Sequence, residues 1–408
     1  MISLFLKTKH LIRNFLKYLN FYLSKIILLI FILKIDKKLS KEELKYFILD
    51  TQTFGEMFSS LKFALCLANK KKIAWNKIIF VLPKIIINYE YIRFLKINFK
   101  VYSDETLYDN LIKSPFIFTK NIYHISPPNG WTDSQNTKFK FCFSNKAMKQ
   151  VNEFLKLNKI KNNFVCISNR DNFFYNNKSN FTNYRNSNFE YYEKTINLLK
   201  KKYNYDVIRM GDYIDEKNKN YISLMNSESK KLLDIYLPSM CKFSINTSSG
   251  IAWVPFLFNK PQLICNAIPL GELPSIHTGI ILPKLITNSE NQIILKIEDL
   301  LKIKILKLNE FNTRSSYKNP IIKYDATRFQ SDFFYKEKKL KILDNTETEI
   351  HTATQELIDY NIKNKKLNSV QKKNQIKFKN AFPKNHPMRN TKAFISPSWL
   401  DKYINFLV

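Results

Sequence analysis

The segment YRNSNFEYYEKTINLLKKKYNYDVIRMGDYI, residues Tyr184–Ile214, gives the clearest indication of the fold. It predicts a helix and then a buried strand, because the apolar run YDVIRM follows a segment with helical periodicity. That periodicity is carried by Tyr192, Ile196, Leu199 and Tyr203. Ser187 with Glu190 three residues later has the pattern of a capping box, which predicts the start of the helix. Gly211 ends the strand.

The same alternation extends in both directions. Towards the C-terminus, KFSIN (242–246) and QLICN (262–266) predict strands. Before the opening segment, NFVCIS (163–168) predicts the strand that precedes the helix. Towards the N-terminus, strands are predicted at YFILD (46–50), KIIFVLP (77–83) and INFKVYS (97–103). Strands that alternate with helices indicate parallel sheets with helical crossovers. We therefore expect an α/β protein with two Rossmann-type lobes that face a cleft.

Four segments are predicted along the chain. Residues 1–39 form a basic amphipathic leader, 40–158 a first Rossmann-like lobe, 159–335 a second, and 336–408 a helical and basic C-terminal extension. Thr346 with Glu349 predicts a capped helix in that extension. Ten Lys or Arg and no acid lie between residues 363 and 392, which is typical of a solvated segment. The final ISPSWLDKYINFLV is apolar enough to dock on a domain.

The leader combines basic residues with an apolar run, IILLIFIL (26–33). Eight residues are too few to span a bilayer, for which about 20 are needed. No small-residue cleavage site follows, which argues against a signal peptide. Two interpretations stay open: a helix on an anionic membrane surface, and a plain packing helix. We expect a cytoplasmic protein, peripheral on the inner face of the cytoplasmic membrane in the first case.

Composition supplies one rival interpretation. The net charge is +32, which favours an anionic partner such as a nucleic acid. However, the basic residues are spread along the whole chain, and no nucleic-acid-binding motif is recognisable. The five cysteines are scattered singly, without metal-ligand spacing, which predicts buried reduced thiols.

Glycine is rare, with six in 408 residues, so each one is informative. Gly55, Gly211 and Gly250 are predicted at the ends of strands, where parallel sheets bind ligands. The loop TSSG (247–250) precedes a predicted helix over IAWVPFLF (251–258). A helix N-terminus with small residues suits a phosphate or diphosphate, and Thr247, Ser248 and Ser249 would add hydroxyl donors. An ordinary capped helix start is the alternative.

Arginines follow the predicted strands of the second lobe. Arg209 ends a buried strand and needs a partner, either an internal acid or an anionic ligand. Arg170 and Asp171 follow another strand, and Arg185 precedes a helix. Structural salt bridges are the alternative for each.

Motifs of several other chemistries are absent from the sequence. It has no GxxxxGK[ST], GxGxxG, HExxH or GxSxG, and no Asp-x-Asp pair that would hold a divalent metal on a sugar nucleotide. The histidines are isolated, and only His277 lies in a loop near the predicted site. The sequence therefore predicts no metal site and no cofactor.

The ordered series CISNRDNFFYN, NYRNSNFEYYEKTINLL, YDVIRMGD, LLDIYLPSMCKFSINTSSG and PFLFNKPQLICNAIPLGELP resembles a family of bacterial glycosyltransferases of the GT-B class. The resemblance covers about residues 160–290, and in the first lobe it rests on TFGEM. It implies two Rossmann-like lobes, the second for a nucleotide-sugar donor and the first for an acceptor. It also implies metal-independent transfer, with a glycan or lipid-linked acceptor in surface polysaccharide or lipopolysaccharide synthesis.

The positions that match the family's motifs fall in four short segments. They are Arg170, Asp171, Tyr184, Arg185, Asn186, Arg209, Met210, Gly211, Ser248, Ser249 and Gly250. Gly55 would be the turn on the acceptor side. Glu56, directly after it, is the candidate base for an acceptor hydroxyl, and Asp171 is the second candidate. A basic nucleic-acid-binding protein and an inactive GT-B-like assembly partner remain the alternatives.

Overall fold

The computed structural model describes residues 44–49, 51, 53–83, 88–103, 108, 122–124, 139–161, 163–171, 183–211, 220–224, 227–270, 279–303, 332–384 and 386–408, with Leu19, Tyr22 and Leu23. Apart from those three residues, the predicted leader (1–39) lies outside the described part, as does His277. No described helix combines the length and the apolar composition needed to cross a bilayer.

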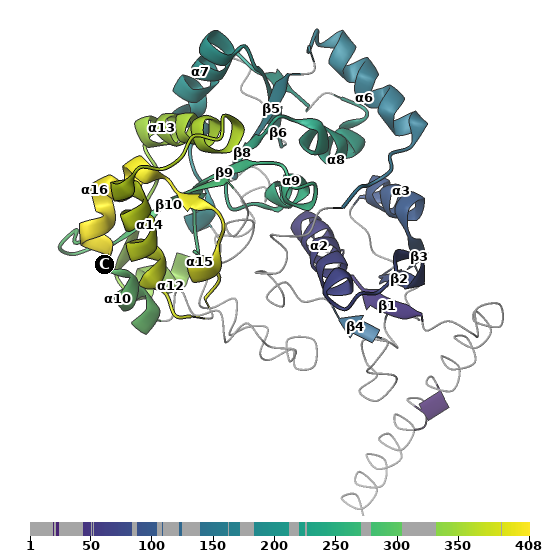
Figure 1. Ribbon diagram of the computed structural model, residues 1–408, viewed down its shortest axis with the longest axis horizontal. Coiled ribbons are helices and arrows are strands. Elements are labelled where there is room, and N and C mark those ends of the chain that lie inside the picture. Colours follow the sequence, from purple (N-terminus) through teal and green to yellow (C-terminus); the bar gives the residue numbers. More distant parts are fainter. Residues whose placement is uncertain are drawn as a thin grey trace, which may run out of the picture.

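The first lobe is built on a four-stranded parallel sheet in the order β3-β2-β1-β4 (Figure 1). Its strands are β1 (Lys45–Ile48), β2 (Ile78–Leu82), β3 (Lys100–Ser103) and β4 (Ile122–His124). Its helical segments are α2 (Phe54–Lys70), η1 (Trp75–Lys77) and α3 (Tyr89–Asn98). Every residue of β2 is buried, as the apolar run predicted.

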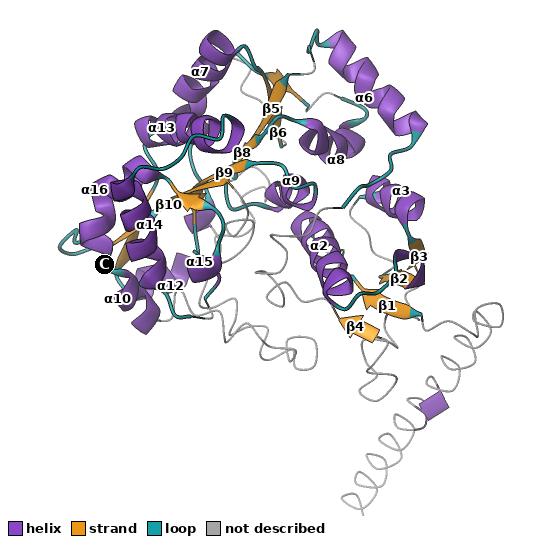
Figure 2. Ribbon diagram, in the orientation of Figure 1, coloured by secondary structure: helices purple, strands orange, loops and turns teal. Residues whose placement is uncertain are grey.

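The second lobe is built on a seven-stranded sheet whose pairings are all parallel, in the order β13-β10-β9-β8-β5-β6-β7. Figure 2 labels five of these strands, β10, β9, β8, β5 and β6. Its strands are β5 (Phe164–Ser168), β6 (Asp206–Met210), β7 (Ile222–Ser223), β8 (Ser244–Asn246), β9 (Gln262–Ala267), β10 (Gly279–Pro283) and β13 (Phe394–Ile395). The strand order reverses between β5 and β8, as in a Rossmann fold. The expected α/β fold with two Rossmann-type parallel sheets is confirmed.

Helices cover both faces of the seven-stranded sheet (Figure 1). The remaining helical elements are α6 (Asn145–Leu157), η3 (Asn183–Arg185), η4 (Phe189–Tyr192), α7 (Glu193–Tyr203), α8 (Lys230–Met240), η5 (Gly250–Ala252), α9 (Trp253–Leu257), α10 (Ile297–Lys302), α12 (Asp332–Glu337), α13 (Glu347–Leu357), the π-helix η8 (Ile358–Ile362), α14 (Ser369–Asn380), α15 (Pro387–Asn390) and α16 (Pro397–Leu407). Helices α7, α13 and α16 share one hydrophobic core with the sheet, and α8 and α9 lie in a second core on the other face.

The C-terminal segment belongs to the second lobe's core. Strand β13 extends the sheet beyond β10, and Trp399, Leu400 and Ile404 of α16 are buried in the same core. Docking of the last stretch is therefore confirmed. A small antiparallel pair, β11 (Leu285–Asn288) with β12 (Leu340–Leu343), connects this segment to β10. Helix α6, which precedes the predicted boundary at residue 158, packs against α8.

Three local predictions are wrong. The strand expected over residues 97–103 begins only at Lys100, because Ile97 and Asn98 end helix α3. Ser187 does not cap the helix, because its hydroxyl donates to Asn169, and Asn188 accepts from the Glu190 amide instead. The chain then makes a 3-10 turn before α7. The helix expected over IAWVPFLF is also shorter: it opens as a 3-10 turn, and only Trp253–Leu257 is α-helical. It stops where Asn259 takes a left-handed conformation (φ 55°).

The thiols also differ from the prediction at one position. None of the five cysteines forms a disulfide, and four are buried, but Cys142 is exposed. The backbone of Cys142 pairs in both directions with the side-chain amide of Asn98 on α3. These two hydrogen bonds attach residues 139–144, the crossing segment between the lobes, to α3.

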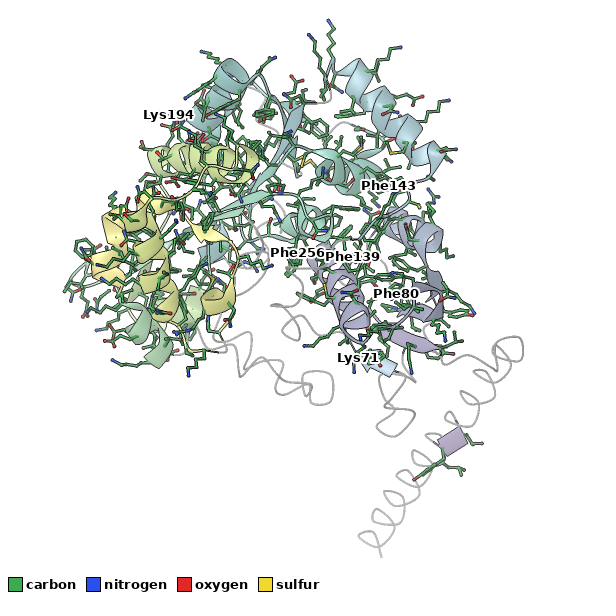
Figure 3. All side chains as sticks on the ribbon, in the orientation of Figure 1. Lys71, Phe80, Phe139, Phe143, Lys194 and Phe256 are labelled. Atoms are coloured by element: carbon green, nitrogen blue, oxygen red, sulfur yellow. The ribbon has the colours of Figure 1, made fainter. Side chains whose placement is uncertain are left out.

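The two lobes share one core. Buried residues of β1, β2, α2 and α3 form a single hydrophobic cluster with those of α8 and α9. The crossing segment adds aromatic rings between them: the Phe141 ring centroid lies 5.2 Å from Phe94 of α3 and 5.2 Å from Phe258 after α9. Phe143 continues to Tyr236 of α8 at 5.0 Å (Figure 3). Aromatic pairs at these distances add stabilising contacts beyond the buried area.

Candidate functional site

The candidate site lies where the order of the seven-stranded sheet reverses. β5 and β8 are neighbours there, and their last side chains meet: the Ser168 hydroxyl donates to Asn246 Oδ1 at 2.6 Å. Asn246 in turn donates to Ser244 and Gln262, so its side chain is fixed inside the sheet. In open parallel sheets, ligands bind outside the carboxyl ends of strands at such a point.

The TSSG loop follows β8 directly. Thr247 Oγ1 accepts a hydrogen bond from the Arg170 amide at 3.0 Å, which joins the loop to the end of β5. Ser248 Oγ accepts from the Ile268 amide at 3.2 Å. The Ser249 hydroxyl is buried and has no hydrogen-bond partner in the structure. Thr247 and Ser248 therefore both act as hydrogen-bond acceptors inside the fold, whereas the Ser249 hydroxyl makes no hydrogen bond.

The NYRN segment lies against this loop. Arg185 Nε donates to the Ser248 carbonyl at 3.0 Å, and a second guanidinium nitrogen donates to the same oxygen. Arg170 Nε donates to Asn186 Oδ1 at 3.2 Å, and the Ser187 amide donates to the Arg170 carbonyl at 3.0 Å. The three predicted segments after β5, around η3 and after β8 are therefore brought together by direct hydrogen bonds.

Arg209 is held by protein groups. Its side chain is 3% exposed, and its guanidinium carbon lies 3.6 Å from the centroid of the Phe189 ring. It donates to the Tyr221 hydroxyl at 3.1 Å, and its other terminal nitrogen lies 3.9 Å from Asp171 Oδ2. The sequence predicted that Arg209 pairs with either an internal acid or an anionic ligand. In the structure Asp171 is that internal acid. A role at a ligand's phosphates stays a prediction for this arginine, as does the assignment of buried Met210 beside it.

Gly211, at the end of β6, has a φ of +111°. Side chains with a Cβ rarely adopt this backbone conformation, which is why an Asn or Lys is unsuited to the position. An added Cβ would meet no atom within 4 Å, so the requirement for glycine comes from the turn alone.

The first lobe reaches the site at Gly55. A Cβ built on Gly250 would lie 3.0 Å from the Gly55 nitrogen, and one built on Gly55 would lie 3.0 Å from the Gly250 Cα. The two backbones are therefore in direct contact, and α2 begins beside the TSSG loop. Glu56 is the next residue of α2 and is half-buried, with its amide capped by Thr53 Oγ1 at 3.2 Å. The turn predicted for the acceptor side and the predicted phosphate loop thus meet at one place.

Sequence reasoning missed two charged residues that hold the NYRN segment. Lys284 lies between β10 and β11, and its ammonium donates to the carbonyls of Tyr184 and Asn186. Asp332 begins α12 and accepts from the amides of Asn183 and Tyr184. Both are about 100 or more residues from their partners, and no local pattern links them, so only the tertiary structure reveals the contacts.

No group of three or more His, Cys, Asp or Glu side chains with a metal-binding arrangement occurs among the described residues.

No protein-family model matches the chain, and no curated protein matches it in sequence. Among solved structures, it is similar to a glycosyl transferase of family 9 from Veillonella parvula DSM 2008, with 11% identity and a TM-score of 0.44 over 77% of this chain and 97% of that one. It is also similar to the ADP-heptose lps heptosyltransferase II of E. coli, with 11% identity and a TM-score of 0.36 over 57% of this chain and 86% of that one.

A third similar structure is the dodecameric iron-containing heptosyltransferase TibC in complex with ADP-D-beta-D-heptose. Its identity is 10% and its TM-score 0.32, over 57% of this chain and 60% of that one. Similarity at this level does not identify the activity of the chain.

Proposed function

We propose that this chain is a glycosyltransferase. In this proposal, the second lobe binds a nucleotide-sugar donor at the carboxyl edge of its sheet, and the first lobe presents a glycan or lipid-linked acceptor. The reaction would serve bacterial surface polysaccharide or lipopolysaccharide synthesis, at the inner face of the cytoplasmic membrane if the leader attaches there.

One observation carries the proposal. The segments of the motif series, which are separated by up to about 80 residues, converge where β5 and β8 end, and hydrogen bonds join Arg170, Arg185 and Thr247 across three loops. This is the place where doubly wound sheets bind nucleotides. The contact of Gly55 with Gly250 brings the first lobe to the same place.

The donor's diphosphate would be met by positive and hydrogen-bonding groups of the loops. Arg170 is partly exposed, and the Ser249 hydroxyl has no partner within the protein. Such groups stabilise the negative charge that develops on the leaving diphosphate, and they do so without requiring a divalent metal ion.

Transfer with inversion needs a base at the acceptor hydroxyl. As the sugar–phosphate C–O bond breaks, its electron pair goes to the diphosphate oxygen, while the acceptor oxygen bonds to the sugar carbon and loses its proton. Glu56 is proposed to take that proton, because α2 places it next to the junction of Gly55 with Gly250. Asp171 is the weaker candidate, because it already lies 3.9 Å from the Arg209 guanidinium.

Ligand binding tests the proposal directly. Thermal unfolding of the full chain is measured with UDP-, GDP-, CDP- and ADP-sugars, with and without EDTA. A ligand at about 100 times its Kd stabilises the folded state by about 2.7 kcal/mol. We expect one nucleotide class to raise the Tm, with EDTA having no effect.

Two arginine variants provide the comparison. Arg170→Ala removes a charged donor at the site and should weaken binding about tenfold or more. Arg93→Ala removes an exposed arginine on α3 that pairs with Glu90 of the same helix, and this variant should bind as the wild type does. No shift with any nucleotide sugar, together with salt-sensitive binding of a random oligonucleotide, would favour the nucleic-acid alternative.

A further inference from the structure

Lys284 is one of the most deeply buried charges of the described residues. Its side chain is 2% exposed, and its ammonium has three acceptors: the Tyr184 carbonyl at 3.0 Å, the Asn186 carbonyl at 2.6 Å and Asp344 Oδ1 at 2.6 Å. An ammonium has three donors, so this arrangement uses all of them.

Burying a charge is costly unless it is paired and hydrogen-bonded. Loss of solvent lowers the pKa of Lys284, and the carboxylates of Asp344 and Asp332 oppose this effect. An apolar side chain in its place would leave the Tyr184 and Asn186 carbonyls without this donor. The buried lysine is therefore explained by what it holds, namely two carbonyls of one short segment.

Asp332 holds the other side of that segment. Its carboxylate accepts from the Asn183 amide at 2.8 Å and from the Tyr184 amide at 2.6 Å. From the same helix, Tyr335 packs against the Tyr184 ring with a centroid distance of 4.9 Å. The single turn of η3 is thus fixed by a cation on its carbonyls and an anion on its amides, contributed by two separate elements.

The segment held in this way is the one that contacts the TSSG loop. Arg185 donates to the Ser248 carbonyl, and Asn186 accepts from Arg170. Since neither Lys284 nor Asp332 belongs to those loops, both act on the site through the position of η3.

We propose that Lys284, with Asp332, is a positioning residue that fixes the Tyr184–Asn186 segment so that Arg185 and Arg170 keep their places beside the TSSG loop. The inference rests on the proposed function in one respect: we expect the nucleotide to bind less tightly when the contacts of Lys284 and Asp332 with this segment are lost. The contacts themselves are a property of the free protein.

Hydrogen exchange of the free chain first tests whether Lys284 holds the Tyr184–Asn186 segment. In Lys284→Met, the amides of Asn183, Tyr184, Asn186 and Ser187 should exchange faster than in the wild type, while those of α2 and β2 keep their protection. Lys379→Met is the matched control, because Lys379 is half-buried and also donates to a backbone carbonyl, that of Thr391, on the C-terminal helices. It should leave the segment unchanged.

Binding of UDP, GDP, CDP and ADP, each titrated in turn by calorimetry, tests the consequence. The nucleotide that binds the wild type should bind Lys284→Met at least about tenfold more weakly, since several positioned groups are lost together. Lys284→Arg, which keeps the charge and the donors, should recover part of the affinity. Lys379→Met should bind like the wild type.

Unchanged exchange of the segment in Lys284→Met would overturn the proposal, and so would faster exchange with unchanged nucleotide affinity. If no nucleotide binds the wild type, the proposed function fails and the positioning role with it, while the exchange data alone still decide whether Lys284 holds the segment. If Lys284→Met does not fold, Asp332→Asn weakens the same segment through its amides, and the same outcomes apply.

Discussion

Lys62 carries a positive charge into the contact between the lobes. Its side chain is fully buried on α2, and the ammonium donates to Asn259 Oδ1 at 2.7 Å. It also lies 5.3 Å from the ring centroids of Phe139 and Phe256, which Figure 3 labels between α2 and α9. Loss of solvent is the main cause that lowers the pKa of Lys62, to about 8 from 10.5.

This buried lysine makes stability depend on pH. Below the folded-state pKa of about 8, both the folded and unfolded forms carry the proton, and the cost of the buried charge is fully present. Above it, the folded form loses the proton first, so the unfolded chain binds more protons and stability rises with pH. From about pH 7.5 to about pH 9.5, we expect the wild type to gain about 2 kcal/mol over Lys62→Met.

The measurement is urea denaturation of both proteins across that range. Tyrosines and thiols also titrate at high pH, but they are common to both proteins, so the difference isolates Lys62. A difference that stays flat with pH would show that the ammonium remains charged throughout. The burial of Lys62 could not be predicted from the sequence. The apolar residues around it predicted a helix but did not show which side of that helix Lys62 would occupy.

At the scale of the element, the start of α13 was predicted from sequence and is confirmed. The Glu349 amide donates to Thr346 Oγ1 at 3.3 Å, and the Thr346 amide donates to Glu349 Oε2 at 2.9 Å. Helix α13 packs on the seven-stranded sheet and against α7, so its stability contributes to the second lobe's core.

Removal of this cap should cost measurable stability. We expect Thr346→Ala to lower the free energy of unfolding by about 1 kcal/mol, because the Glu349 amide loses its acceptor, Thr346 Oγ1. Thr352→Ala, in the middle of the same helix, is the control and should be neutral or slightly stabilising, since alanine has the higher helix propensity. Equal losses in both variants would mean that the cap contributes nothing specific.

Most strands could be predicted from their apolar runs, because a parallel sheet covered on both faces demands continuous burial. The strands β1, β2, β5, β6 and β9 lie within a residue or two of the predicted positions. Helix starts were less predictable: Ser187 had the sequence pattern of a cap, but its hydroxyl bonds to Asn169 of a neighbouring loop instead. Local propensity cannot account for a partner that the fold supplies.

At the scale of the whole molecule, the contact of Gly55 with Gly250 sets how closely α2 and the TSSG loop approach. Neither glycine has a left-handed φ, so an alanine at either position meets only the steric problem. At 3.0 Å the neighbouring atoms must give way by a few tenths of an ångström, and here they are backbone atoms of the other glycine rather than the end of a flexible side chain.

Substitution at this contact should separate the lobes. We expect Gly55→Ala and Gly250→Ala each to reduce stability by about 1–3 kcal/mol. Since both relieve the same clash by the same shift, the double variant should lose clearly less than the sum of the two. Chemical denaturation of the four proteins provides the cycle. Strict additivity would indicate that the two glycines are not in contact in solution.

The sequence by itself determined the α/β class, most of the strands, the two Rossmann-type sheets and the segments that meet at the candidate site. These features follow from periodicity and from the rule that parallel strands end at one edge, both of which are local or general. The tertiary structure decided which acid pairs Arg209, that Lys284 and Asp332 hold the NYRN segment, and that Gly55 touches Gly250. Those contacts join residues far apart in the chain, and their energies depend on burial and distance, which no local pattern encodes.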